Sequence, residues 1–113
     1  MHEFSIAMNV VEIAAEYAGK EKAKVVREIE IEVGELSGIV LEALEFALES
    51  AVKDTILEHA RIVMTVIPGK ARCIQCYYEY HTSDLFRSCP VCRSCAPDII
   101  GGKELRVKSI TVD

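Results

Sequence analysis

The chain has 113 residues, of which 50% are hydrophobic and 27% are charged, and its formal net charge is −5. This length suffices for one compact domain with at most a small appendage, and it excludes a multidomain enzyme. The composition is that of a folded protein and excludes extensive disorder. No apolar run approaches the roughly 18 residues that cross a bilayer, and the first residues lack the features of a signal peptide, so we expect a soluble, cytoplasmic protein.

Charges and cysteines are both distributed unevenly along the chain. Residues 1–68 hold six Lys or Arg and thirteen Asp or Glu, whereas residues 69–113 hold seven and five. An acidic first part does not attract a phosphate backbone. All five cysteines lie between residues 73 and 95. In a cytosolic chain, thiols clustered in this way indicate a metal site rather than a set of disulfides.

The first expected element is an amphipathic helix over Ser5–Ala18, with Gly19 as its C-terminal stop. Its apolar positions at three- and four-residue spacing, which we expect to be buried, are Ile6, Val10, Ile13, Ala14 and Tyr17. From Arg27 to Val33, charged residues alternate with β-branched residues. This alternation predicts a half-buried strand that ends at Gly34.

A second helix is expected to begin after Ser37, because a serine hydroxyl can accept a backbone N–H of the first helical turn. Its acidic residues form a solvated side rather than a site, and its apolar residues form the buried side. The acidic residues are Glu42, Glu45 and Glu49, and the apolar residues are Ile39, Val40, Ala43, Leu44, Ala47, Leu48, Ala51 and Val52.

Two further strands are expected at Ala60–Ile67, which Pro68-Gly69 closes, and at Glu104–Val112, which follows Gly101-Gly102. The cysteine module, at about residues 71–97, therefore interrupts the order of elements as an insertion. We predict an α+β fold, with two helices packed on one face of a small three-stranded sheet and a metal-binding ribbon module inserted before the last strand.

Two cysteine pairs carry the strongest chemical signal in the chain. Cys73 and Cys76 form one C-x2-C pair and Cys89 and Cys92 form another, with residues 77–88 between them. Two such turns can supply four thiolates to one tetrahedral ion at Zn–S distances of about 2.3 Å. A site closed by four thiolates has no position for water or substrate, so we predict a structural zinc ion.

Other interpretations of this module remain open. Iron in a rubredoxin-like electron carrier would use the same four thiolates. Cys92 and Cys95 form a third C-x2-C pair, and Cys95 is either a spare thiol or an alternative ligand. His81 and His59 are expected at the surface, although His81 lies between the two main pairs. A nucleic-acid interface would use stacking tyrosines and phosphate-binding arginines, here Tyr77, Tyr78, Tyr80, Arg72, Arg87 and Arg93.

The N-terminus begins Met1-His2-Glu3. A terminal amine, the deprotonated amide of His2 and its imidazole can bind one ion through fused chelate rings, and Glu3 can add a donor. Such nitrogen-rich, near-planar sets suit Ni(II) and Cu(II) better than Zn(II). Copper would bind more tightly, so selection of nickel would depend on availability and partners.

Taken together, Met1-His2-Glu3, Val33-Gly34-Glu35-Leu36-Ser37, the two C-x2-C pairs and Gly102-Lys103-Glu104-Leu105 resemble the HypA family of hydrogenase-maturation nickel metallochaperones. The resemblance covers the whole chain. It implies a nickel-binding α/β domain of residues 1–70 and 101–113, and a zinc-binding ribbon domain of residues 71–100. It matches Met1, His2 and Glu3 to the family's nickel site, and Cys73, Cys76, Cys89 and Cys92 to its zinc ligands.

The resemblance further implies a carrier rather than an enzyme, with Zn(II) as a structural ion and Ni(II) as cargo. The implied partners are the HypB GTPase, the precursor of the [NiFe]-hydrogenase large subunit and, in some organisms, urease maturation proteins. It implies neither nucleic-acid nor membrane binding and leaves a homodimer open. Two residues depart from the family pattern: Cys95 lies outside the four-cysteine set, and Arg93 stands where such turns often have glycine. The main alternative function is a zinc-ribbon module that binds nucleic acid or protein.

Overall fold

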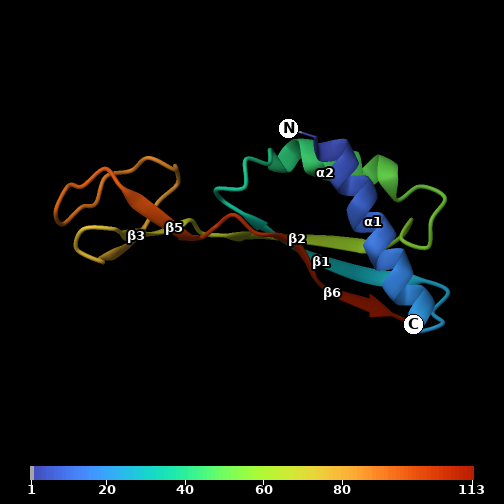
Figure 1. The fold of residues 1–113 in the computed structure, drawn as a ribbon. Helices are drawn as coiled ribbons and strands as arrows, with labels where there is room; N and C mark the ends of the chain where they lie inside the picture. Colours follow the sequence, from blue (N-terminus) through green and yellow to red (C-terminus); the bar gives the residue numbers. More distant parts are fainter. Residues whose placement is uncertain (1) are drawn as a thin grey trace. The chain divides into compact units, whose positions relative to one another are not determined.

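The computed structural model describes residues 2–113. Within them the chain forms two helices and six strands (Figure 1). Their order is α1 (Glu3–Lys20), β1 (Val26–Gly34), α2 (Leu41–Ala51), β2 (Arg61–Ile67), β3 (Lys70–Cys73), β4 (Glu79–His81), β5 (Pro97–Gly101) and β6 (Leu105–Val112). The strands form two sheets, ordered β2-β1-β6 and β4-β3-β5. The predicted α+β fold with an inserted cysteine module is confirmed.

The chain divides into two compact units. One unit contains the residues up to Glu32 together with Ile39–Thr65 and Arg106–Asp113, and the other contains Val33–Gly38 and Val66–Leu105. The end of β1 and the turn after it thus group with the cysteine module. None of the helices in residues 2–113 is long and apolar enough to span a bilayer.

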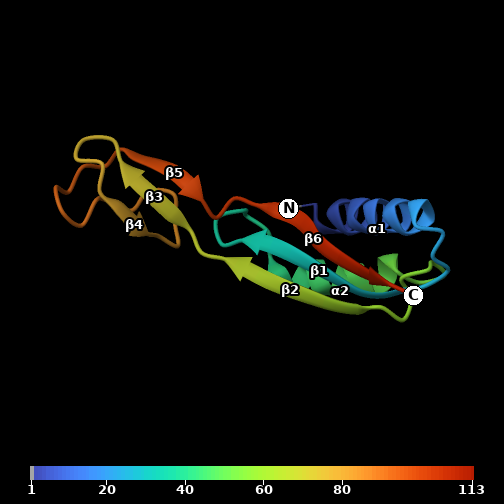
Figure 2. The same ribbon diagram turned by 90° about the horizontal axis from the view of Figure 1, so that it is seen from below.

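In the first unit, α1 and α2 pack against each other and cover one face of the sheet (Figure 1). Figure 2 shows that β1 and β2 run in the same direction and that β6 runs in the opposite direction. The crossover from β1 to β2 contains α2, as parallel neighbours require. Ile29 and Ile31 of β1 belong to the buried core, and each is at most 1% exposed.

The predicted buried face of α1 is partly wrong. Val10 and Ala14 are buried as expected, but Ile13 and Tyr17 are 44% and 58% exposed. The face that is buried instead consists mainly of small residues, namely Ala7, Val10, Val11, Ala14 and Ala18. Small side chains let the helix backbone approach its neighbours closely, so the larger residues lie at the edge of the contact. Gly19 is also not the stop, because the helix continues to Lys20.

The start of α2 differs from the prediction as well. The helix begins at Leu41. Its N-cap residue is Val40, whose side chain makes no capping hydrogen bond. Gly38 adopts a φ of 78°, and the Ser37 N–H donates to the Gly34 carbonyl, so residues 34–38 form a turn rather than a first helical turn. Val40 is therefore exposed, whereas Leu44, Ala47, Leu48, Ala51 and Val52 are buried as predicted.

The charged face of β1 carries ion pairs to both neighbouring strands. Glu30 pairs with Lys108 at 3.4 Å, and Glu32 pairs with Arg106, both of which lie on β6. Glu28 lies 3.9 Å from Arg61 of β2. The alternation of charged and β-branched residues thus predicted the strand correctly. Its charged face is less solvated than expected, because Glu28 and Glu30 are half-buried and Glu32 is buried.

In the second unit, β3 pairs with β4 and with β5, in both cases antiparallel. The core of this unit is small and contains two of the cysteines. Its buried members are Ala71, Cys73, Tyr80 and Cys89, with Ile99 packed against them. A core of this size contributes little free energy of folding by itself, which is the usual situation of a metal-stabilised module.

Candidate metal centre

Four cysteines converge at the end of the second unit. The sulfur atoms of Cys73, Cys76, Cys89 and Cys92 all lie within 4.8 Å of one another. The Cys73 and Cys92 sulfurs are 3.4 Å apart, and those of Cys76 and Cys89 are 3.6 Å apart. A tetrahedron with metal–sulfur distances of about 2.3 Å has edges of about 3.8 Å. The four thiols therefore fit a single tetrahedral metal ion.

The two C-x2-C pairs form equivalent turns. In the first, Tyr77 donates its N–H to the Cys73 carbonyl at 2.9 Å; in the second, Arg93 donates to the Cys89 carbonyl, also at 2.9 Å. The first sulfur of each pair also accepts the N–H of the second cysteine, at 3.5 Å in both turns. These N–H groups point at the sulfurs and stabilise their negative charge.

The pKa values of the four thiols fall into two classes. The Cys76 N–H is the main cause that lowers the pKa of Cys73 to about 6, and the Cys92 and Val91 N–H groups outweigh burial to lower that of Cys89. The Ser94 N–H acts to lower the pKa of Cys92. The neighbouring Cys73 sulfur and desolvation outweigh it and raise the pKa of Cys92 to about 12.

The pKa of Cys76 is also raised, so each close sulfur pair joins a cysteine of lowered pKa to one of raised pKa. A divalent cation at the centre would displace the remaining protons.

The centre is closed on its inner side. Cys73 and Cys89 are each 1% exposed, and Tyr80 packs beside them. Burial raises the pKa of Tyr80, whose hydroxyl donates to the Arg87 carbonyl at 2.8 Å. Four sulfur donors complete a tetrahedral coordination, so such a centre holds the ribbon together and leaves no open position for a reacting group.

The other predicted candidates of this module lie outside the four-sulfur group. Cys95 is exposed, and its sulfur contacts the Ser88 hydroxyl at 3.5 Å. His81 Nε2 lies 2.9 Å from Glu35 Oε1, and His59 is exposed. Within residues 2–113, the structure places none of these three side chains among the four clustered thiols.

The residues considered for nucleic-acid binding are largely engaged in contacts within the module. Tyr80 is buried, Arg72 pairs with Glu79 at 3.1 Å, and the Arg87 guanidinium donates to the His81 carbonyl at 2.6 Å. Tyr77 and Tyr78 are exposed. The set therefore does not form a continuous platform of aromatic and basic side chains.

The predicted nickel residues lie at the start of α1. Met1 lies outside the described residues. His2 is the exposed N-cap residue, and its carbonyl accepts the Ile6 N–H at 3.1 Å. An N-cap residue enters the helical hydrogen-bond ladder through its carbonyl, so the His2 amide nitrogen stays outside that ladder.

The Glu3 carboxylate contacts the start of the second helix. Its Oε2 accepts the Val40 N–H at 3.3 Å. Burial acts to raise the pKa of Glu3, but the Val40 N–H and nearby positive charges outweigh it and lower the pKa. The carboxylate that the sequence suggested as a further metal donor thus also fastens α1 to α2.

Sequence reasoning missed the role of Glu35. Its Oε1 accepts the Gly69 N–H at 2.9 Å and lies 2.9 Å from His81 Nε2. The residue stands inside Val33-Gly34-Glu35-Leu36-Ser37, which carried the family resemblance but no assigned chemistry. A glutamate in a turn next to a glycine is too common a pattern to have identified this contact.

Comparison with known proteins identifies the class. Residues 1–112 match a family model described as "Hydrogenase/urease nickel incorporation, metallochaperone, hypA". The hydrogenase maturation factor HypA of Parabacteroides distasonis is 47% identical over 112 residues, which cover 99% of this chain and 97% of that protein. The HypA of Geobacter metallireducens is 40% identical over 113 residues, which cover 100% of both chains.

Two solved structures share the fold. The solution structure of a HypA protein superposes with a TM-score of 0.73 at 22% identity, covering 99% of this chain and 96% of that one. The solution structure of the Ni metallochaperone HypA from Helicobacter pylori gives 0.71 at 22% identity, covering 99% and 97%. The chain belongs to the HypA family of nickel metallochaperones for hydrogenase maturation, which are maturation factors rather than enzymes. The resemblance noted in the sequence is confirmed.

Proposed function

We propose that this protein binds Ni(II) through Met1, His2 and Glu3 and delivers it during the maturation of [NiFe]-hydrogenase. The observation that carries the proposal is the match to the nickel-incorporation family over residues 1–112, in a chain that begins Met1-His2-Glu3. The exposed position of His2 at the start of α1 supports it, because incoming nickel can reach the imidazole without unfolding the helix. A site at a chain end also suits a carrier, which has to release its metal.

The four-cysteine centre is proposed to hold a structural zinc ion. Four sulfur donors at tetrahedral spacing favour Zn(II), whereas Ni(II) cargo prefers nitrogen-rich donor sets. When bound, zinc would supply the folding free energy that the small ribbon core lacks. On this proposal residues 1–70 and 101–113 form the nickel-binding domain, and residues 71–100 form the zinc-binding domain.

The proposed partners follow from the family. They are the HypB GTPase and the precursor of the hydrogenase large subunit, and the family description extends the proposal to urease. Reduced cysteines and a nickel client within the cell favour a cytoplasmic location. A homodimer is compatible with this role but is not required by it.

Complementation tests the proposal in a cell. A strain that lacks its own HypA, supplied with this chain, should recover hydrogenase activity at ordinary nickel concentration. The His2→Ala variant should fail to restore activity unless excess nickel is added, whereas His59→Ala should restore it fully. Equal activity with wild type and His2→Ala at low nickel would contradict a role of the N-terminus.

A further inference from the structure

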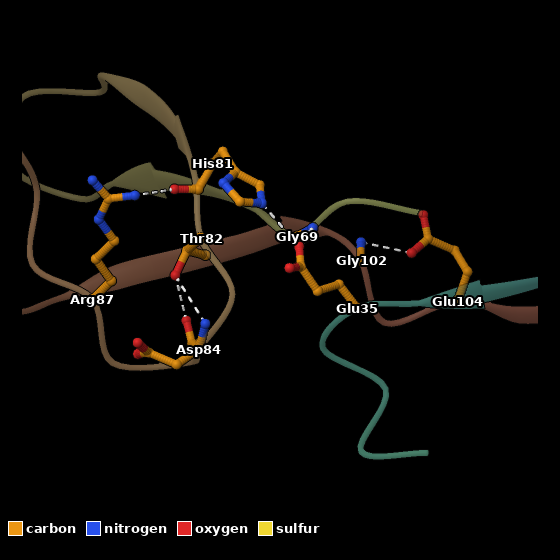
Figure 3. Close-up of polar contacts among 8 residues, drawn as sticks. All are labelled: Glu35, Gly69, His81, Thr82, Asp84, Arg87, Gly102 and Glu104. Atoms are coloured by element: carbon orange, nitrogen blue, oxygen red, sulfur yellow. Dashed lines mark hydrogen bonds and ion pairs between the residues drawn. The ribbon is translucent and has the colours of Figure 1, made fainter. Parts of the chain in front are cut away.

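A continuous set of contacts leads from the buried cysteines to the segment Val33–Gly38. Tyr80 packs beside Cys73 and Cys89, and its hydroxyl donates to the Arg87 carbonyl at 2.8 Å. The Arg87 guanidinium lies 5.8 Å from the Tyr80 ring centre and donates to the His81 carbonyl at 2.6 Å (Figure 3). The position of His81 is therefore fixed through side chains that surround the cysteine centre.

The loop after His81 is held equally firmly. The Thr82 hydroxyl donates to the Asp84 carbonyl at 2.6 Å and accepts the Asp84 N–H at 3.2 Å. The Thr82 N–H donates to the Gly69 carbonyl at 3.0 Å, which joins the end of β4 to the residue before β3. Thr82 is 1% exposed, so this turn belongs to the packed part of the unit.

Glu35 joins these two chain segments to a third. It accepts the Gly69 N–H at 2.9 Å, and its carboxylate faces the His81 imidazole at 2.9 Å (Figure 3). The Gly69 N–H, followed by His81, lowers the pKa of Glu35, so the carboxylate is ionised at neutral pH. The Glu104 carboxylate, drawn in the same view, accepts the Gly102 N–H at 2.6 Å (Figure 3).

The packing around Gly69 leaves little freedom at this point. A Cβ added to Gly69 would lie 2.0 Å from the Thr82 carbonyl oxygen and 2.8 Å from the Leu36 side chain. The Leu36 N–H donates to the Gly102 carbonyl at 2.6 Å. Segment 33–38 is thus in close contact with Gly69 and Gly102, which flank the cysteine module. Through Glu35 it also contacts His81, which belongs to the contacts around the cysteine centre.

We propose that the His81–Glu35 pair is a latch through which the metal state of the four-cysteine centre sets the order of Val33–Gly38. The inference rests on the proposed loading of that centre with zinc. Without the ion, the two cysteine turns lose the bond that joins them, and the small core around Tyr80 cannot hold β3 and β4 alone. His81 then loses its fixed position and Glu35 loses one of its two contacts. Val33–Gly38 contains the end of β1 and the turn after it, so the latch sets the order of the chain where it leaves β1 toward α2.

Amide hydrogen exchange of the full chain, followed by NMR, tests the latch. The probes are the Gly34, Glu35 and Leu36 amides, in the zinc-loaded protein, after chelation, and after reloading with Zn(II). In the wild type these amides should exchange faster after zinc removal and recover on reloading. In zinc-loaded His81→Ala they should already exchange roughly two- to fivefold faster than in the wild type, as expected for an exposed pair.

Three comparisons decide the outcome. His81→Ala should show a clearly smaller further increase on zinc removal than the wild type. The Glu35→Ala/His81→Ala double variant should match Glu35→Ala, because His81 has no partner in the pair once the carboxylate is gone. Arg72→Ala removes an ion pair to Glu79 on the same two strands and should respond as the wild type does. Slow exchange in zinc-loaded His81→Ala, or a full wild-type increase in that variant, would overturn the latch. If metal analysis found no zinc in the wild-type protein, the proposed zinc loading would be refuted. If the wild type held one zinc per chain but amide exchange in Val33–Gly38 did not change on zinc removal, only the latch would be refuted.

Discussion

Tyr77 and Arg93 hold equivalent positions in the two cysteine turns and share one backbone conformation, with φ values of 65° and 64°. Each directly follows the second cysteine of its pair and closes the turn with its N–H. A residue with a Cβ in this left-handed region costs of order 1 kcal/mol or more. Arginine at position 93, where such turns often have glycine, therefore adds backbone strain. It does not change the turn, which keeps the geometry of the turn that ends at Tyr77.

Replacing Arg93 by glycine should relieve this strain. Arg93→Gly is expected to stabilise the zinc-loaded ribbon by about 1 kcal/mol, because glycine adopts positive φ without a steric penalty. The measurement is the midpoint of thermal unfolding with one zinc per chain. Arg93→Ala is the matched control, since it removes the same side chain but keeps the Cβ. A glycine variant less stable than the alanine variant would contradict the assignment of strain.

The choice of ligands can be tested by comparing two cysteines. Cys92→Ser should lower the zinc content or weaken zinc binding strongly, because the Cys92 sulfur lies in the four-sulfur group. Cys95→Ser should leave one zinc per chain, because the Cys95 sulfur contacts Ser88 instead. Metal analysis after dialysis against a competing chelator measures both. Zinc retained by Cys92→Ser and lost by the double variant would show that Cys95 can replace Cys92.

Two glycines should respond to alanine in opposite ways. Gly69→Ala places a Cβ 2.0 Å from the Thr82 carbonyl oxygen and should destabilise the protein by about 1–3 kcal/mol. Gly19 lies within α1 and has no atom within 4 Å of an added Cβ, so Gly19→Ala should stabilise by about 0.5–1 kcal/mol. Urea unfolding measures both changes. An unchanged free energy of unfolding in Gly69→Ala would contradict the close packing of Gly69 against Thr82 and Leu36.

The contact between Glu3 and Val40 predicts a pH dependence. Because the pKa of Glu3 is lowered on folding, its ionised form contributes stability above the unfolded value of about 4.3, and this is lost as pH falls through the folded pKa. Val40→Pro removes the donor N–H, and the Val40 φ of −84° is close to that of proline. Between pH 6 and 3 the variant should lose less stability than the wild type in urea titrations. Parallel pH profiles would argue against the hydrogen bond.

Local sequence patterns predicted both helices and the strands of the first sheet, because each of these elements carries its own periodicity. The short strands β3, β4 and β5 of the cysteine module were not predicted individually. The alternation before Gly34 located β1 and its ion-paired face, and the two C-x2-C pairs located the metal centre. The buried face of α1 was predicted less well, since burial of Ala7 and Ala18 instead of Ile13 and Tyr17 depends on how closely the helix approaches its neighbours. That distance is a property of the packed protein and leaves no local signal.

The contacts that fasten the segments together were not predictable either. Glu3 and Val40 are separated by 37 residues, and Glu35 and His81 by 46. A carboxylate can accept many different N–H groups, and only the fold selects which one it meets. The Ser37 cap was wrong for a related reason, because the positive φ of Gly38 ends the turn before α2 can begin.

Nickel titration of untagged, zinc-loaded protein tests the central claim most directly. Calorimetry should show one Ni(II) bound per chain in the wild type and in His59→Ala. A variant with one extra residue before Met1, and His2→Ala, should lose this binding while zinc content and unfolding temperature stay unchanged. Unaltered nickel affinity in the extended chain would contradict a site built on the terminal amine and would end the proposed role of the N-terminus.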